Sequence, residues 1–327
     1  MPSLTKKERV RAALAGQAVD RTPASLWGHD FLREWDPQDL ADATIEDYRT
    51  NDWDFIKLNP RWTYFAEAWG STYEPPTKQR HPGPLAKAVS DVSDLGRIEP
   101  KDPKSGVFAE HLHALRLTID AAGPDVDVIQ TIFSPLSVLG LMCGAPRRLI
   151  EFAKEQPEAV RSALEAITET LTAYAAESMS AGATGIFYAP LFWASRETCT
   201  EDFYREYGRP GDMIVLGAIE EAPFNILHVC QNHNMLDQLL DYPVAAFNWA
   251  DHGEGNPSLA EARTRTDKAV MGGIDHARLH AMSVDDIAAQ GREALDACPD
   301  HFLLAGGCGI RPDTSSENRK AVATAAS

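Results

Sequence analysis

The chain has 327 residues, of which 44% are hydrophobic and 24% are charged, and its formal net charge is −17. This acidity, with no basic stripe, argues against nucleic-acid binding, because nucleic-acid phosphates attract clustered lysine and arginine. No apolar run approaches the roughly 18 residues of a membrane helix, and the N-terminus lacks the apolar core of a secretory signal. We therefore expect a cytoplasmic protein that binds no membrane. Its five sparse cysteines also argue against a disulfide framework.

Eight short apolar segments predict β-strands. They cover residues 22–26, 54–58, 126–131, 185–188, 226–229, 244–248, 269–273 and 302–305. Helical patterns cover residues 6–15, 108–122, 157–181, 201–207, 234–241, 258–265, 283–297 and 314–326. Strands that alternate with helices, without hairpin turns, are parallel, and eight such units predict a single (β/α)8 barrel over residues 1–327. The alternative, an open doubly wound sheet, lacks a G-x-G-x-x-G motif after its first strand.

One long segment interrupts this alternation. Residues 66–105 are rich in proline and in charged side chains. Loops of this length are uncommon in compact domains and often serve function. We expect residues 66–105 to form an insertion over the mouth of the barrel.

Polar, metal-binding side chains follow two of the predicted strands. His228 and Cys230 are two positions apart at the end of a strand, so both project from the same face. Cys308 comes directly after the strand at 302–305. Active sites of (β/α)8 barrels lie at the carboxyl ends of their strands. One histidine and two cysteines are typical ligands of a catalytic zinc ion, which keeps its fourth position open for substrate. The pattern therefore predicts a zinc site at the barrel mouth.

Each of these residues also has a simpler interpretation. A single His or Cys at a strand end is more often a packed core residue. A structural zinc would need a fourth ligand, for which His233 is the nearby candidate.

Further polar and aromatic residues fall at strand ends. His29, Asn248, His252 and Asp275 lie there, and each can contact substrate or cap a loop. An aromatic wall at the mouth is expected from Trp27, Trp62, Tyr64, Tyr188, Trp193 and Trp249, some of which can instead pack under loops. From these two sets we select His29, Tyr188, Asn248 and Asp275 as candidate substrate-binding residues.

Several stretches of the sequence resemble one known family. They include Asp20-Arg21-Thr22-Pro23, Asp54-Phe55-Ile56-Lys57, His228-Val229-Cys230, Gly272-Gly273-Ile274-Asp275 and Gly307-Cys308-Gly309. Over nearly its whole length the chain looks like the uroporphyrinogen decarboxylase superfamily. These (β/α)8 barrels include the decarboxylase and zinc methyltransferases that act on methylcobamides.

The resemblance favours the methyltransferase branch, whose zinc ligands match His228, Cys230 and Cys308. It implies that an acidic residue about twenty positions after the histidine can complete the zinc shell, and Asp251 stands in that region. It further implies methyl transfer between a corrinoid (a methylcobamide) and a thiol-type acceptor. The zinc-bound thiolate of the substrate is then the nucleophile, with no nucleophile from the protein. The corrinoid would arrive on a separate partner protein, and an oligomer is left open.

Two alternatives remain. The first is decarboxylation of a porphyrinogen or of a smaller acid. The decarboxylase resembles this chain less. Only Arg33 remains of the decarboxylase's arginine motif, and Asn59 stands near the place of its central aspartate. The second is a barrel that only binds a metal or senses a ligand.

Overall fold

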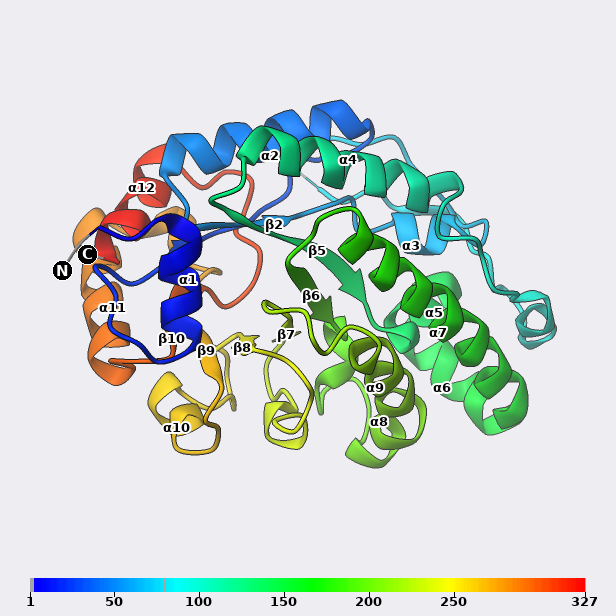
Figure 1. The fold of residues 1–327 in the computed structure, drawn as a ribbon. Coiled ribbons are helices and arrows are strands. Elements are labelled where there is room, and N and C mark those ends of the chain that lie inside the picture. Colours follow the sequence, from blue (N-terminus) through cyan, green and yellow to red (C-terminus); the bar gives the residue numbers. More distant parts are fainter. Residues whose placement is uncertain (1–2, 79, 327) are drawn as a thin grey trace.

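The computed structural model describes residues 3–78 and 80–326, and its centre is a sheet of eight parallel strands (Figure 1). The strands follow the order β1–β10–β9–β8–β7–β6–β5–β2. They are β1 (Ala24–Ser25), β2 (Phe55–Leu58), β5 (Asp127–Phe133), β6 (Gly185–Ala189), β7 (Ile226–Val229), β8 (Ala246–Trp249), β9 (Ala269–Ile274) and β10 (Phe302–Gly306). The sheet curls into a nearly closed barrel, which confirms the predicted (β/α)8 architecture.

Helices surround this barrel (Figure 1). They are α1 (Lys6–Leu14), α2 (Pro37–Asn51), α3 (Tyr64–Glu67), α4 (Gly106–Ala122), α5 (Pro135–Cys143), α6 (Pro146–Glu155), α7 (Pro157–Ser180), α8 (Glu201–Tyr207), α9 (Arg209–Gly217), α10 (Leu259–Arg263), α11 (Val284–Ala297) and α12 (Ser316–Ala325). Several begin at capping boxes that satisfy the first backbone amides, such as Thr5 with Glu8 at α1 and Ser283 with Asp286 at α11. In the described part of the chain, no helix is long and apolar enough to cross a membrane.

Two features of the helices differ from expectation. The helix predicted over 234–241 is wrong, because that stretch contains only the 3-10 turn Leu236–Gln238. The side chain of Asn234 accepts a hydrogen bond from the Leu236 amide at 3.2 Å and so stabilises a turn instead. The sequence reading also missed α2, α3, α5, α6 and α9.

Ion pairs hold the seam of the barrel, where β1 and β2 are not paired as strands. The Asp54 amide donates to the Ala24 carbonyl at 2.9 Å, and the Asp54 carboxylate accepts from the Ala24 amide at 2.8 Å. That buried carboxylate also binds Arg9 at 2.7 Å and Arg21 at 2.6 Å. Arg21 and Asp54, two residues from the motifs that carry the family resemblance, thus close the barrel together with Arg9.

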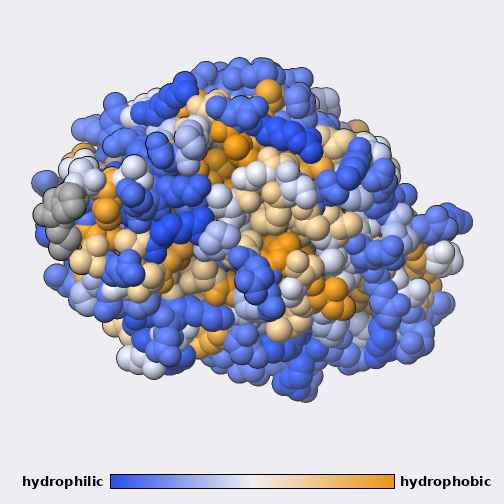
Figure 2. Space-filling view, viewed as in Figure 1, coloured by the Kyte–Doolittle hydropathy of each residue, from blue (hydrophilic) through white to orange (hydrophobic). Residues whose placement is uncertain are grey.

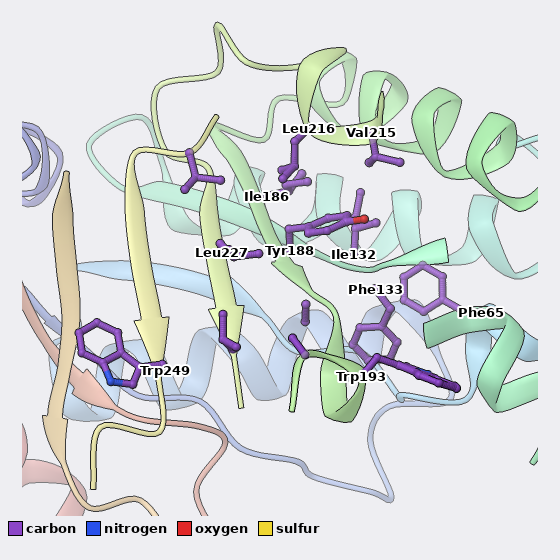
Figure 3. Packing of buried hydrophobic residues seen from close by; sticks show 14 of the residues in the cluster. Phe65, Ile132, Phe133, Ile186, Tyr188, Trp193, Val215, Leu216, Leu227 and Trp249 are labelled. Carbon is purple, nitrogen blue, oxygen red and sulfur yellow. The ribbon is translucent and has the colours of Figure 1, made fainter. Parts of the chain in front are cut away.

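The strands separate two apolar layers. One fills the barrel and includes Phe55, Phe187 and Ile226. The other lies between the strands and the helices; Figure 3 shows part of it, with Tyr188 among the outward side chains. The outer surfaces of the helices are largely hydrophilic, and apolar residues gather toward the middle of the face seen in Figure 2.

The segment 66–105 has its own small structure. It contains a two-stranded antiparallel sheet, β3 (Thr72–Tyr73) with β4 (Pro84–Ala86), and a 3-10 helix, Val92–Arg97. Between the two strands, the ring of His81 packs on the rings of His29 and Phe31, with centroids 4.9 and 4.6 Å apart. The segment therefore contacts the stretch that follows β1.

Candidate active site

Polar side chains occupy the inside of the barrel near the carboxyl ends of three strands. Phe55 and Ile226 lie in the inner apolar layer, and Lys57 and His228 follow them by two positions on the same strands. Because alternate residues of a strand share a face, both side chains point into the barrel. Asn248 on β8 lies opposite His228 in the strand register and contacts it.

The hydrogen bonds of Asn248 determine which nitrogen of His228 carries the proton. The Asn248 amide nitrogen donates to the carbonyls of Met271 at 2.9 Å and Gly306 at 3.1 Å, so its oxygen must face the histidine. That oxygen lies 2.6 Å from Nδ1 of His228. Nδ1 therefore carries a proton, and in the neutral imidazole the lone pair is on Nε2. Histidines that bind metals are held in this way by a second residue.

Nε2 of His228 faces the sulfur of Cys308 at 3.5 Å. In a tetrahedral zinc site, with sulfur about 2.3 Å and nitrogen about 2.0 Å from the ion, two such ligand atoms lie about 3.5 Å apart. The observed separation therefore suits a shared metal ion.

The two thiols form a pair in which one is acidic. A hydrogen bond from the Cys230 thiol holds the pKa of Cys308 well below its ordinary value. The same contact with Cys308, together with burial, raises the pKa of Cys230. Thiolates are the form in which cysteine binds metals. The donor set of His228, Cys230 and Cys308 therefore fits a thiolate-binding ion such as zinc.

The candidate ligand atoms of His228, Cys230 and Cys308 are not arranged around one common position. Across residues 3–78 and 80–326, no group of three or more His, Cys, Asp and Glu side chains is positioned to hold a metal ion. Binding an ion would therefore require a small rotation of these side chains, for example of Cys230, whose sulfur accepts a long hydrogen bond of 3.6 Å from Gln231.

Asp251 lies deeper in the wall of the barrel. Its side chain is 4% exposed, and one oxygen accepts from the Gly273 amide at 3.0 Å. The other oxygen has no hydrogen-bond partner among the described residues. Burial raises the pKa of Asp251 to about 6. Within the described structure, no hydrogen bond or ion pair joins Asp251 to His228, Cys230 or Cys308.

Two residues near the cysteines were not among the candidates predicted from the sequence. One is His276, a half-buried histidine close to Cys308, and burial lowers the pKa of His276. It follows Asp275 at the end of β9, so its position at a strand end could have indicated it.

The other is Lys57, a buried lysine inside the barrel. Its ammonium lies over the ring of Phe187 at 4.7 Å and over the ring of Trp27 at 5.5 Å. The Phe187 ring also packs on His228, with centroids 4.9 Å apart. Burial lowers the pKa of Lys57 to about 7, with Cys308 as its main acidic neighbour. Its position two residues after an apolar strand residue could have indicated it.

The remaining candidates have different surroundings. His29, after β1, lies 2.7 Å from the Glu34 carboxylate and near the mouth of the cavity described below. Asp275 caps its own turn by accepting from the amides of Ala277 and Arg278 at 3.1 and 3.3 Å. Tyr188 points out of the barrel and donates to Asp212 at 2.7 Å. The structure therefore does not bring Tyr188 to the site. Asn248 does lie in the site, where its partner is His228.

A cavity of about 570 Å³ lies along the seam between β1 and β2. Trp27, His29, Lys57 and Asn59 line it toward the barrel, and α2 borders it on the outside. This volume accommodates a small-molecule ligand.

The comparisons agree with this architecture. The chain is 25% identical over 348 residues to the methylcobamide:CoM methyltransferase MtaA of Methanosarcina barkeri, covering 99% of this chain and 98% of the relative. It is 23% identical to MtbA of Methanosarcina acetivorans, covering 97% and 96%. A solved methyltransferase from Methanosarcina mazei has a TM-score of 0.82 at 23% identity, covering 99% and 98%. A B12-independent methionine synthase from Shewanella sp. has a TM-score of 0.58 at 14% identity, covering 93% and 96%. Residues 5–327 match the family described as Uroporphyrinogen decarboxylase (URO-D), and the chain belongs to that family.

Proposed function

We propose that this protein is a zinc-dependent methyltransferase that moves a methyl group between a corrinoid and a thiol-type acceptor. The observation that supports it most is the free lone pair of His228 facing the acidic thiol of Cys308 at 3.5 Å. The relatives named methylcobamide:CoM methyltransferases match this chain over almost its full length. We propose that the corrinoid arrives on a partner protein and that the reaction takes place in the cytoplasm.

In this proposal His228, Cys230 and Cys308 hold the zinc, which when bound would deprotonate the acceptor thiol and supply it as a nucleophile. Asn248 keeps the Nδ1 proton of His228 in place, so that Nε2 stays available. Asp251 or water is the proposed fourth ligand, which the acceptor replaces; His276 is a second candidate for that position.

The aromatic rings of Trp27 and Phe187 lie beside His228, with ring centroids 6.5 and 4.9 Å from that of the imidazole. We further propose that residues 66–105 cover the mouth, because His81 already contacts His29 at the end of β1. His29 and Asp275 are proposed to border the substrate there.

Decarboxylation is the second candidate, favoured by the family itself. The one arginine left for a substrate carboxylate, Arg33, is paired with Glu46 at 2.6 Å. Asn59, near the place of the decarboxylase aspartate, bonds to Lys57 and to the Gly28 carbonyl. These contacts favour the methyltransferase. Efficient conversion of uroporphyrinogen in an anaerobic assay would reverse that preference.

Metal analysis of protein purified without chelator tests the proposal. We expect about one zinc per chain in the wild type and in Cys298→Ser, a control at a buried cysteine that caps α11. Cys308→Ser should lose the zinc and the methylation of thiols by methylcobalamin, with little change in melting temperature, because the large core does not depend on the metal.

Three results would contradict the proposal. A collapse of melting temperature together with zinc loss in Cys308→Ser would indicate a structural metal. A wild type that binds no zinc after reconstitution under reducing conditions would exclude the zinc site. Zinc binding without any methyl transfer from methylcobalamin would leave a metal-binding barrel.

A further inference from the structure

Lys57 is a buried lysine that forms no ion pair with a carboxylate of the described residues. The residue is 8% exposed, and among the described residues no carboxylate lies within 4.0 Å of its ammonium. An ammonium carries three N–H donors, and the side-chain oxygen of Asn59 is the one acceptor that the structure gives it. An unpaired buried charge is costly. An anion that binds from outside would therefore stabilise the charged form of Lys57.

Asn59 holds this ammonium in a defined place. The Asn59 amide nitrogen donates to the Gly28 carbonyl at 2.9 Å, which turns its oxygen toward Lys57. The rings of Trp27 and Phe187 flank the ammonium. Two N–H groups stay available beside the seam cavity, which both Lys57 and Asn59 line.

The other cations of the cavity are engaged or exposed. Arg33 is paired with Glu46 at 2.6 Å, and Arg319 with Asp47 at 2.7 Å. Lys78 lies at the exposed rim. Lys57 is thus the buried cation that an incoming anion would meet next to the cysteine cluster.

We infer that Lys57 forms a subsite for the acidic group of a small organic anion, a carboxylate or a sulfonate, with Asn59 as its positioning residue. The Phe187 ring contacts both Lys57 and His228, so the subsite lies beside the proposed zinc ligands. For an acceptor that carries both a thiol and an acidic group, Lys57 then selects the anionic acceptor over a neutral one. This last step rests on the proposed function, whereas the binding of the anion does not.

Equilibrium binding to chelator-treated protein tests the subsite without any metal. The probes are the anions propane-1-sulfonate and propionate, and propan-1-ol, which has the same chain length, is the neutral control. Binding is measured by calorimetry and by tryptophan fluorescence. We expect saturable binding of at least one of the two anions, and which one binds separates sulfonate from carboxylate recognition. Lys57→Met should weaken that binding at least tenfold, and Lys57→Arg should retain part of it.

The chain offers a matched control at Lys268. Among the residues that the structure describes, its ammonium also has a single acceptor, the Tyr242 carbonyl, and it lies over an aromatic ring, Phe247, at 5.5 Å. Lys268→Met should bind the anions as the wild type does. Lys57→Met should melt no lower than the wild type, because it removes an unpaired buried charge. Equal binding of anions and propan-1-ol, unchanged binding in Lys57→Met, or no binding in the wild type would each overturn the inference.

Kinetics with methylcobalamin separate recognition from an effect on the metal site. With zinc-loaded Lys57→Met, KM should rise at least tenfold for 3-mercaptopropionate and stay within twofold for 2-mercaptoethanol. An equal fall in kcat for both acceptors would mean that Lys57 acts on the cysteine cluster, and would overturn its role in selection. If the wild type transfers no methyl group, the proposed function fails, while the binding result still decides the subsite.

Discussion

Replacing Asn248 by alanine should weaken zinc binding without touching a zinc ligand. Asn248 is fully buried, and its oxygen fixes the proton on Nδ1 of His228. Without it the imidazole is free to rotate and to place its proton on Nε2, which then cannot bind a metal. Loss of such a supporting residue typically costs 10- to 100-fold in metal affinity. This corresponds to about 1.4–2.7 kcal/mol at 25 °C.

A matched control separates this effect from general destabilisation. Asn318 is also a buried asparagine, and its amide donates to two backbone carbonyls, those of Leu279 at 2.6 Å and Met282 at 3.0 Å. Asn318→Ala therefore removes the same kind of hydrogen bonds but no histidine contact. Both variants should lose about 1–3 kcal/mol of unfolding free energy for the carbonyls left unpaired.

The assay is competition for zinc between each variant and a chromophoric chelator, with urea unfolding measured in parallel. We expect weakened zinc binding in Asn248→Ala alone. Zinc affinity within threefold of the wild type in Asn248→Ala would refute the role assigned to Asn248. An equal loss in both variants would show that overall stability, and not the histidine proton, controls the site.

Three further predictions concern stability and pH. Tyr204→Phe removes a 2.6 Å hydrogen bond to Asp212 and should cost about 1.5–3 kcal/mol in urea unfolding at pH 8. Burial raises the pKa of Asp212 to about 6, and the hydrogen bond from Tyr204 opposes this rise because it stabilises the charged carboxylate. The cost of Tyr204→Phe should therefore grow as the pH rises through about 6. The same cost at pH 5 and pH 8 would contradict a charged acceptor. Asp54→Ala leaves buried Arg9 with one carboxylate fewer and should lower the unfolding free energy by about 3 kcal/mol; a loss under about 1 kcal/mol would show that the seam does not depend on it. Zinc affinity should fall between pH 8 and pH 6, because the thiolates and the imidazole must be free of protons; a constant affinity in the chelator assay would exclude thiolate ligands.

The sequence predicted the strands well because each is a short apolar run with clear ends. It predicted helices less well, and in one of them the reason is a missing amphipathic stripe. In α5 (Pro135–Cys143), eight of the nine residues are buried, so no polar face marks the helix. At α2, by contrast, Asp36 before Pro37 is a helix start signal that the sequence itself contains.

Only the part of the candidate site that lies along one strand was predictable from the sequence. His228 and Cys230 share a face by spacing alone. Phe187 and Tyr188 do not reveal which of them faces inward, because a strand buried on both sides has no polar alternation. The roles of Asn248 and Lys57 depend on contacts between different strands, which no local pattern contains.

The seam between β1 and β2 determines when the site can form. β1 pairs with β10, the last strand of the chain, across some 280 residues of sequence, so the ring closes only when both ends of the chain are present. Cys308 follows β10, whereas His228 and Cys230 belong to β7 and the turn after it. An incomplete chain therefore has two of the three proposed ligands and an exposed sheet edge, which is a hazard for aggregation during synthesis. If His228, Cys230 and Cys308 hold a zinc ion as proposed, the ion can bind all three only after the segment that follows β10 has been made.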